Sequence, residues 1–265
     1  MITERYLLHF FTSQKMFLLS TRSLAGYGLD HIFQIAKSAN CDGIDLSLDF
    51  SEFDSYDPVY IDTIRKRHDL TIISITAPVR RLTPKHAEEI LSLAEKLDIA
   101  IVNFFPPHRL DKDKEWFWEG LKTLTSKYPK ITINIINAPP KTWLFVISEY
   151  GNARPELIKK ITGHTAFSIE NVEPESWVDL MKTFTLLGNT VTMVYFSDKN
   201  EEKNGMFPGT GSMPLESLLI RMKEAGYNGI FSLDIAPNSL DAWSSDREVV
   251  ENIKKSQAYL MKYFG

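Results

Sequence analysis

Cysteine is almost absent from this chain of 265 residues, in which Cys41 is the only one. A lone cysteine excludes internal disulfides and a zinc cluster built from cysteine ligands. The chain also lacks an excess of positive charge, because 30 lysines and arginines stand against 34 acidic residues, a net charge of −4. It therefore has no overall positive field with which to hold nucleic acid.

Long apolar runs are missing as well. No stretch approaches the roughly 18 consecutive apolar residues that a membrane helix needs. The apolar patches near the N-terminus are interrupted by Arg5, His9 and Lys15, and no signal-peptide cleavage pattern follows them. We therefore expect a cytoplasmic protein without a membrane or nucleic-acid partner, and the sequence leaves its oligomeric state open.

A glycine-rich dinucleotide or phosphate loop after an early strand is also missing, which disfavours an open doubly wound sheet. The chain instead alternates short apolar runs with longer amphipathic stretches, which is typical of parallel strands joined by helices. Eight runs are rich in the Ile, Val, Phe and Thr of buried parallel strands: Met16–Ser20, Gly43–Leu48, Thr71–Thr76, Ile99–Phe104, Ile131–Ile136, Thr165–Ile169, Val191–Phe196 and Gly229–Ile235.

Capping residues mark several of the helices between these strands. Thr83 stands at an N-cap position and Pro84 follows in the first turn. Pro214 opens another helix, and Gly226 lies just past its end. We predict helices over Leu29–Ala39, Pro84–Leu97, Pro155–Ile161 and Pro214–Ala225. A helix after each of eight strands predicts an α/β protein, a (β/α)8 TIM barrel that forms a single domain over residues 1–265, with residues 1–15 as a lead-in.

The segment Pro208–Ile235 reads PGTGSMPLESLLIRMKEAGYNGIFSLDI. It resembles the last loop, helix and strand of the xylose isomerase-like TIM barrels, a family that includes sugar phosphate isomerases and epimerases. The glycines and Tyr227 of the family pattern are kept, whereas Asp234 stands where the family has a metal-binding Glu. Three further segments, Ala39–Asp49, Ile133–Pro139 and Val191–Asp198, are similar to the regions of the second, fifth and seventh strands of that family.

The resemblance implies a divalent metal held by four residues at the strand ends. Carried over to this chain, those positions are Ile136 at the end of the fifth strand, Glu170 after the sixth, Tyr195 in the seventh and Asp234 in the eighth. Isoleucine has no lone pair, and a neutral phenol is a poor ligand. We therefore expect no cofactor in a degenerate metal site, with a divalent metal (Mn, Mg, Zn or Co) on Glu170 and Asp234 as the alternative. A second alignment to the family matches the SIEN segment, residues 168–171, to the fifth strand, with Glu170 and Asp198 as the ligands after the fifth and sixth strands. That alignment leaves only one predicted strand after Asp198, so the strand count argues against it.

The resemblance also implies a reaction, the transfer of a proton at a carbon next to a carbonyl group. Glu170 and Asp234 are the candidate catalytic residues, because two converging carboxylates raise one pKa by repulsion and burial. The candidate ligands are a small sugar or a sugar phosphate. The candidate substrate-binding residues lie at or after the strand ends and are Arg81, Arg109, Asn137, Trp143, Tyr195 and Lys199. Arg80, His108 and Lys141 add to the positive charge of the same loops. The alternative is a non-catalytic barrel that binds a carbohydrate or metabolite after losing the metal site.

Overall fold

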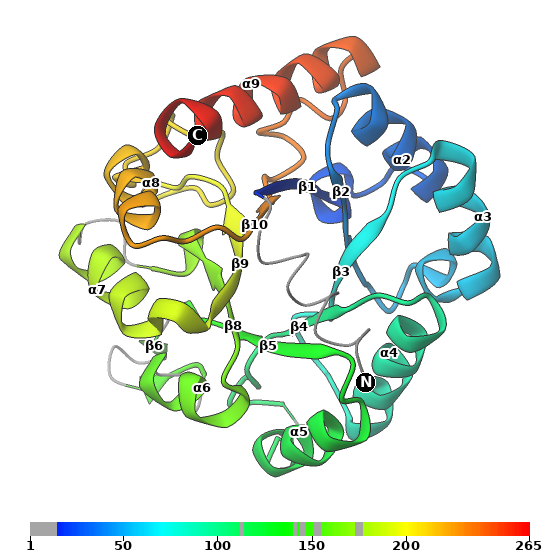
Figure 1. Ribbon diagram of the computed structural model, residues 1–265, viewed down its shortest axis with the longest axis vertical. Coiled ribbons are helices and arrows are strands. Elements are labelled where there is room, and N and C mark those ends of the chain that lie inside the picture. The colour runs from blue at the N-terminus through cyan, green and yellow to red at the C-terminus, as the bar shows by residue number, and fades with distance from the viewer. Residues whose placement is uncertain (1–14, 112–113, 140–141, 144–146, 151–154, 173–176) are drawn as a thin grey trace.

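Eight parallel strands close into a barrel, and helices surround it (Figure 1). The computed structural model describes residues 15–111, 114–139, 142–143, 147–150, 155–172 and 177–265. The order of the strands around the barrel is β1-β10-β9-β8-β5-β4-β3-β2, and β2 pairs with β1 to close it. The barrel strands are β1 (Met16–Ser20), β2 (Gly43–Ser47), β3 (Ile72–Thr76), β4 (Ile101–Phe104), β5 (Thr132–Ile136), β8 (Thr165–Ser168), β9 (Val191–Phe196) and β10 (Ile230–Leu233).

All eight predicted strands are confirmed, and so is the (β/α)8 fold, since a helix follows each barrel strand in the described part of the chain. Most strands are one or two residues shorter than the apolar run that predicted them. The predicted lead-in lies outside the described residues except for Lys15. The helices are α2 (Leu29–Ser38), α3 (Pro58–His68), α4 (Pro84–Lys96), α5 (Trp116–Lys127), α6 (Pro155–Thr162), α7 (Trp177–Leu187), α8 (Leu215–Glu224) and α9 (Asp246–Phe264).

Local hydrogen bonds explain where several helices begin. Thr83 caps α4, as predicted, because its Oγ1 accepts a hydrogen bond from the His86 amide at 3.2 Å. The helix α8 begins at Leu215, one residue later than predicted, so Pro214 is its N-cap residue and not part of its first turn. A short hairpin of β6 (Thr142–Trp143) and β7 (Ile147–Ser148) follows β5 and was not predicted. None of the described helices is both long and apolar enough to cross a membrane.

Apolar side chains fill the space between the strands and the helices, and a smaller apolar cluster fills the inside of the barrel. The inner cluster includes Leu18, Ile101, Ile136 and Met193, which come from four different strands. Alternate residues of a barrel strand point inward, so the inner layers can differ in character from the outer ones. Here part of the inside is polar, and the buried polar residues on the strands include Asp45, Ser74, Thr76, Asn103, Asn134 and Ser232.

Asp45 lies inside the barrel with none of its surface exposed. Its Oδ1 accepts hydrogen bonds from Ser74 at 2.7 Å and from Thr76 at 2.9 Å, and its Oδ2 accepts one from Ser232 at 3.2 Å. Burial raises the pKa of Asp45 to about 6, although the three hydroxyl groups oppose the shift. A carboxylate in this position lowers the stability of the folded chain at neutral pH, which is typical of a residue kept for function.

Replacement of Asp45 by Asn is expected to change how stability depends on pH. The folded-state pKa lies above the value of about 3.9 for an unfolded Asp, so the folded state is favoured below pH 4 and loses that advantage as the pH rises through 6. A pKa difference of roughly 2 corresponds to about 3 kcal/mol. Urea unfolding from pH 4 to pH 8 should show wild type losing up to about 3 kcal/mol relative to Asp45→Asn. A constant difference between the two proteins would contradict the buried, ionised carboxylate.

Candidate active site

Two carboxylates and one guanidinium meet at the carboxyl end of the barrel. Arg22 follows β1, Glu170 follows β8 and Asp234 follows β10. Arg22 Nε donates a hydrogen bond to Asp234 Oδ1 at 2.9 Å, and Arg22 Nη2 donates a second one to Asp234 Oδ2. The same Nη2 contacts Glu170 Oε1 at 3.3 Å. The pair of bonds to Asp234 is the bidentate arrangement that matches a guanidinium to a carboxylate.

The backbone around Arg22 is fixed on both sides. Arg22 belongs to a short 3-10 turn, Thr21–Leu24, that leaves β1. Thr21 Oγ1 accepts a hydrogen bond from the Ser47 amide at 2.9 Å, which joins the turn to β2. Ser23 Oγ donates to the Leu233 carbonyl at 3.1 Å and accepts from the Ile235 amide at 2.9 Å, which joins it to β10. Arg22 is therefore held between the two strands that flank β1.

Glu170 is fixed by its own turn, Ile169–Asn171, which follows β8. Asn137, at the end of β5, accepts a hydrogen bond from the Ser168 amide at 2.6 Å and donates one to the Ser168 carbonyl at 3.0 Å. Asn171 donates to the Asn137 carbonyl at 2.7 Å. The side chain of Asn137 thus extends the pairing of β5 with β8 and positions Glu170. Its predicted contact with a substrate stays a prediction.

The charged groups of this cluster shift the pKa values of Glu170 and Arg22. Burial and the nearby Asp234 carboxylate raise the pKa of Glu170, and Arg22 opposes that shift. Asp234 raises the pKa of Arg22, which keeps the guanidinium charged. The side chains of Glu170 and Arg22 are 16% and 39% exposed, whereas that of Asp234 is 4% exposed. A ligand at the mouth can therefore reach Glu170 and Arg22, while Asp234 lies behind them.

Tyr195 is buried below this cluster and is 3% exposed. Its hydroxyl lies 2.6 Å from Thr76 Oγ1. Tyr195 is on β9 and Thr76 is on β3, and these strands lie on opposite sides of the barrel (Figure 1). The phenol therefore spans the barrel and forms a floor beneath the charged cluster. Burial raises the pKa of Tyr195 well above its usual value, so the phenol stays neutral.

The residues at the four positions implied by the resemblance do not fit a divalent metal. Ile136 is inside the barrel, fully buried, and offers no donor atom. Tyr195 is paired with Thr76, and both carboxylates contact Arg22. Within the part of the chain that the structure describes, no three His, Cys, Asp or Glu side chains form a group able to hold a metal ion. The guanidinium lies between the carboxylates and supplies the positive charge that they share.

Asp198 follows β9 and has a structural role. Its Oδ1 accepts hydrogen bonds from the amides of Lys199 at 2.8 Å and Met213 at 3.2 Å. Its Oδ2 accepts from Gly209 and Gly211, both at 2.9 Å. Gly211 has no room for a side chain, since a Cβ there would lie 2.4 Å from Asp198 Oδ1. One carboxylate thus organises the loop between β9 and α8, which is the glycine-rich segment in the sequence resemblance.

The remaining predicted substrate-binding residues are spread around the rim. Arg81 and Arg109 are exposed on the loops after β3 and β4. Lys199 is buried after β9. Trp143 is on β6, and its side chain, like residue Lys141, lies outside the described residues. The structure therefore brings Glu170 and Asp234 together around Arg22, while their catalytic role and a role in binding for these other residues stay predictions.

Sequence reasoning missed Arg22 and Asp45. Two signals were available, namely a cation directly after the first strand and an acidic residue in the middle of an apolar run. Each signal gains its meaning from partners far away in the sequence. Arg22 and Asp234 are 212 residues apart, and Asp45 and Ser232 are 187 residues apart.

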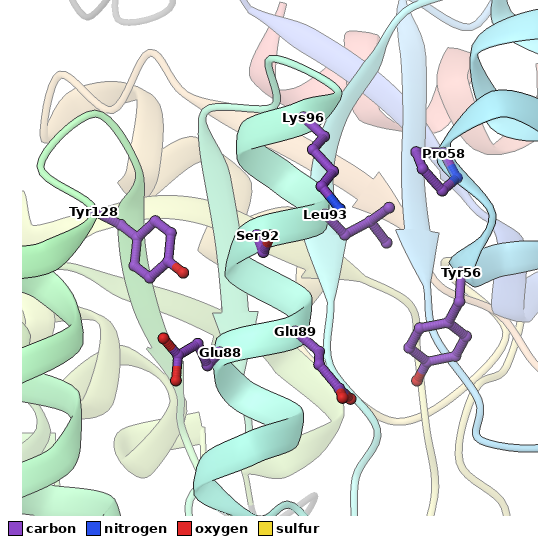
Figure 2. A pocket seen from close by; sticks show the side chains of 8 residues that line it. All are labelled: Tyr56, Pro58, Glu88, Glu89, Ser92, Leu93, Lys96 and Tyr128. Carbon is purple, nitrogen blue, oxygen red and sulfur yellow. The ribbon is translucent and has the colours of Figure 1, made fainter.

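A groove of about 480 Å³ lies elsewhere, on the outer surface of the barrel. Figure 2 shows that α4 runs through it, with Tyr128 and Glu88 on one side of the helix and Tyr56 and Glu89 on the other. Glu88 forms an ion pair with Lys127. The residues that line the groove include none of Arg22, Glu170 and Asp234, which meet at the carboxyl ends of the strands where barrel enzymes carry their chemistry, so we do not place the active site there.

Comparison with known proteins supports the fold. The sequence matches no protein-family model, and no curated protein is similar to it in sequence. Solved structures do match. D-psicose 3-epimerase with D-tagatose from Clostridium cellulolyticum H10 is 9% identical, with 94% of this chain and 99% of that chain covered and a TM-score of 0.70.

Two further solved structures are similar over nearly their full length. A xylose isomerase domain protein from Alicyclobacillus acidocaldarius is 13% identical, with 94% of this chain and 98% of that chain covered and a TM-score of 0.64. The IOLI protein with a bound zinc atom is 13% identical, with 94% and 99% covered and a TM-score of 0.72. The chain therefore has the fold of the xylose isomerase-like TIM barrels, which confirms the resemblance at the level of the fold.

Replacement of Asp198 by Asn tests the structural role of this residue. An amide has one acceptor oxygen, so its NH2 group would face two backbone N–H donors. We expect a loss of about 2–3 kcal/mol in the free energy of unfolding, measured with urea. Glu201→Gln, on an exposed position of the same loop, is the matched control and should change stability by less than about 0.5 kcal/mol. Equal effects of the two substitutions would contradict the role of Asp198.

Proposed function

We propose that this chain is a sugar isomerase or epimerase-like enzyme that transfers a proton without a metal ion. The observation that carries the proposal is the cluster of Arg22, Glu170 and Asp234 at the mouth of the barrel. The substrate class is a small sugar or sugar phosphate with a carbonyl group. The similarity to D-psicose 3-epimerase supports this class by analogy of fold.

Proton transfer next to a carbonyl needs a base at the carbon and a positive charge at the oxygen. In the proposed reaction, the ionised Glu170 takes the proton from the carbon. The electron pair of the broken C–H bond forms a C=C bond, and the carbonyl oxygen becomes an oxyanion. Arg22 stabilises that oxyanion through its exposed face. Glu170 then returns the proton to the carbon of the former carbonyl group. The hydroxyl proton of the deprotonated carbon passes to the oxyanion, and the C=C electron pair forms the new C–H bond as that hydroxyl becomes the new carbonyl, so the substrate is isomerised without net oxidation or reduction.

Asp234 has a supporting role in this scheme. It holds the guanidinium through two hydrogen bonds and lies behind it, away from solvent. Glu170 shares a single 3.3 Å contact with Arg22 and is more exposed, so it is the better placed of the two to reach a substrate. One mobile proton on one carboxyl group favours transfer between adjacent carbons over inversion at a single carbon, which needs groups on both faces.

The raised pKa of Glu170 gives the reaction a defined pH dependence. A general base must be ionised, so kcat/KM is expected to rise as the pH increases through the pKa of Glu170 and then to level off. Since burial and Asp234 both raise that pKa, the rise is expected above the pH at which an exposed Glu would already be ionised.

Exchange with heavy water tests the proposal. Wild type is incubated in D2O and EDTA with D-fructose, D-tagatose, D-ribulose and their phosphates, and deuterium next to the carbonyl is measured by NMR. We expect incorporation into at least one sugar, and a loss of at least about 100-fold in Glu170→Gln. Glu202→Gln, an exposed carboxylate on the loop after β9, is the matched control and should keep the wild-type rate.

Two results would contradict the proposal. Exchange that appears only after Mn²⁺, Mg²⁺, Zn²⁺ or Co²⁺ is added would restore the metal-dependent reaction. Exchange that survives Glu170→Gln would remove the proposed base. If none of the sugars exchanges but one stabilises the fold in a thermal shift assay, the second candidate holds, namely a non-catalytic carbohydrate-binding barrel. That candidate is favoured by the engagement of Asp198 and Asn137 in structural hydrogen bonds.

A further inference from the structure

A chain of hydrogen bonds links the buried Asp45 to the floor of the site. Thr76 Oγ1 lies 2.9 Å from Asp45 Oδ1 and 2.6 Å from the Tyr195 hydroxyl. All three residues are buried, with exposures of 0% for Asp45, 4% for Thr76 and 3% for Tyr195. The charged groups that act on this chain from neighbouring elements are Asp234 after β10 and Arg22 after β1. Tyr195 pairs in register with Ser232 on β10, two residues before Asp234, so the chain of hydrogen bonds lies beneath the proposed reaction site.

The number of protons fixes the direction of these hydrogen bonds. A threonine hydroxyl has one proton to donate. The ionised Asp45 can only accept, so the proton of Thr76 is directed to Asp45 Oδ1. Thr76 Oγ1 must then accept from Tyr195, because two oxygens 2.6 Å apart need a proton between them. The Tyr195 phenol therefore donates its proton to Thr76 inside the barrel and has none left to donate to a ligand.

Protonation of Asp45 leaves this direction unchanged. Ser232 Oγ lies 3.2 Å from Asp45 Oδ2 and can accept a proton carried by that oxygen. Oδ1 then still accepts from Ser74 and Thr76. The direction depends on an acceptor oxygen at this position rather than on its charge, so an Asn at position 45 would keep it.

We propose that Asp45 is a positioning residue that makes the phenol oxygen of Tyr195 a hydrogen-bond acceptor toward the site. A ligand group above the floor must then donate, as the hydroxyl of a sugar does. A carbonyl, carboxylate or phosphate oxygen at this point would face the lone pairs of the phenol. The inference rests on the proposed function and deepens it, since it selects a sugar with a free hydroxyl directed to the floor and any anionic group elsewhere.

Three substitutions separate this role from a merely structural one. Asp45→Asn keeps Oδ1 as the acceptor and places an NH2 group toward Ser232. Asp45→Leu has a similar size and removes the acceptor, so Thr76 becomes free to donate to Tyr195. Thr76→Val keeps the shape of the side chain and removes the hydroxyl between the two residues.

The C–O stretching band of the Tyr195 phenol reports whether its hydroxyl donates or accepts a hydrogen bond. The band is isolated, without ligand, as the infrared difference between each protein and the same protein that also carries Tyr195→Phe. We expect a donor band in wild type and in Asp45→Asn, and its loss in Asp45→Leu and Thr76→Val. An acceptor band in wild type, or a donor band that survives in both Asp45→Leu and Thr76→Val, would overturn the inference. If Asp45→Leu does not fold, Thr76→Val decides the outcome.

Kinetics of the deuterium exchange provide the second measurement, with the sugar that exchanges fastest as the probe. Asp45→Leu is expected to raise KM by about tenfold, the equivalent of one hydrogen bond, while kcat changes little. In Asp45→Asn, KM should stay within about twofold of the wild-type value. Equal KM values in Asp45→Asn and Asp45→Leu would overturn the inference. The infrared result does not depend on turnover. A chain without exchange activity but with the expected bands would therefore refute the proposed function and leave the direction of the hydrogen bonds intact.

Discussion

The ion pair between Arg22 and Asp234 is the interaction on which the rest of the site depends. It joins the first and the last strand of the barrel, which pair side by side. A buried carboxylate without a partner would be strongly unfavourable, and Glu170 adds a second negative charge close by. Arg22 contacts both carboxylates and offsets part of their charge, so one guanidinium both links the first strand to the last and sets the electrostatics of the mouth.

The fold places a guanidinium where the xylose isomerase-like resemblance implies a metal ion. A divalent ion and a guanidinium both neutralise carboxylates, but the guanidinium donates hydrogen bonds in a fixed plane and needs no other ligands. In the metal-free site that we propose, the positions of Ile136 and Tyr195 supply no ligand, and Tyr195 forms the floor of the site.

The sequence was sufficient for the fold because the information is local. Each strand is a short apolar run, and helix starts such as Thr83 have their partners within one turn. Glu170 and Asp234 could be proposed as neighbours since both follow strands, and strand ends meet at one face of a barrel. Arg22 and Asp45 could not, because their roles depend on which side chains face them across the barrel. The pairing of Tyr195 with Thr76 joins positions 119 residues apart and follows from packing alone.

A double-mutant cycle between Arg22 and Asp234 tests the central claim most directly. The free energies of unfolding of wild type, Arg22→Met, Asp234→Asn and the double variant are compared in urea at pH 7. We predict a coupling energy above about 1 kcal/mol, because each single substitution leaves the other group without its partner. Effects that add to within about 0.5 kcal/mol would show that the two side chains do not interact, and would contradict the account of a guanidinium that organises the site.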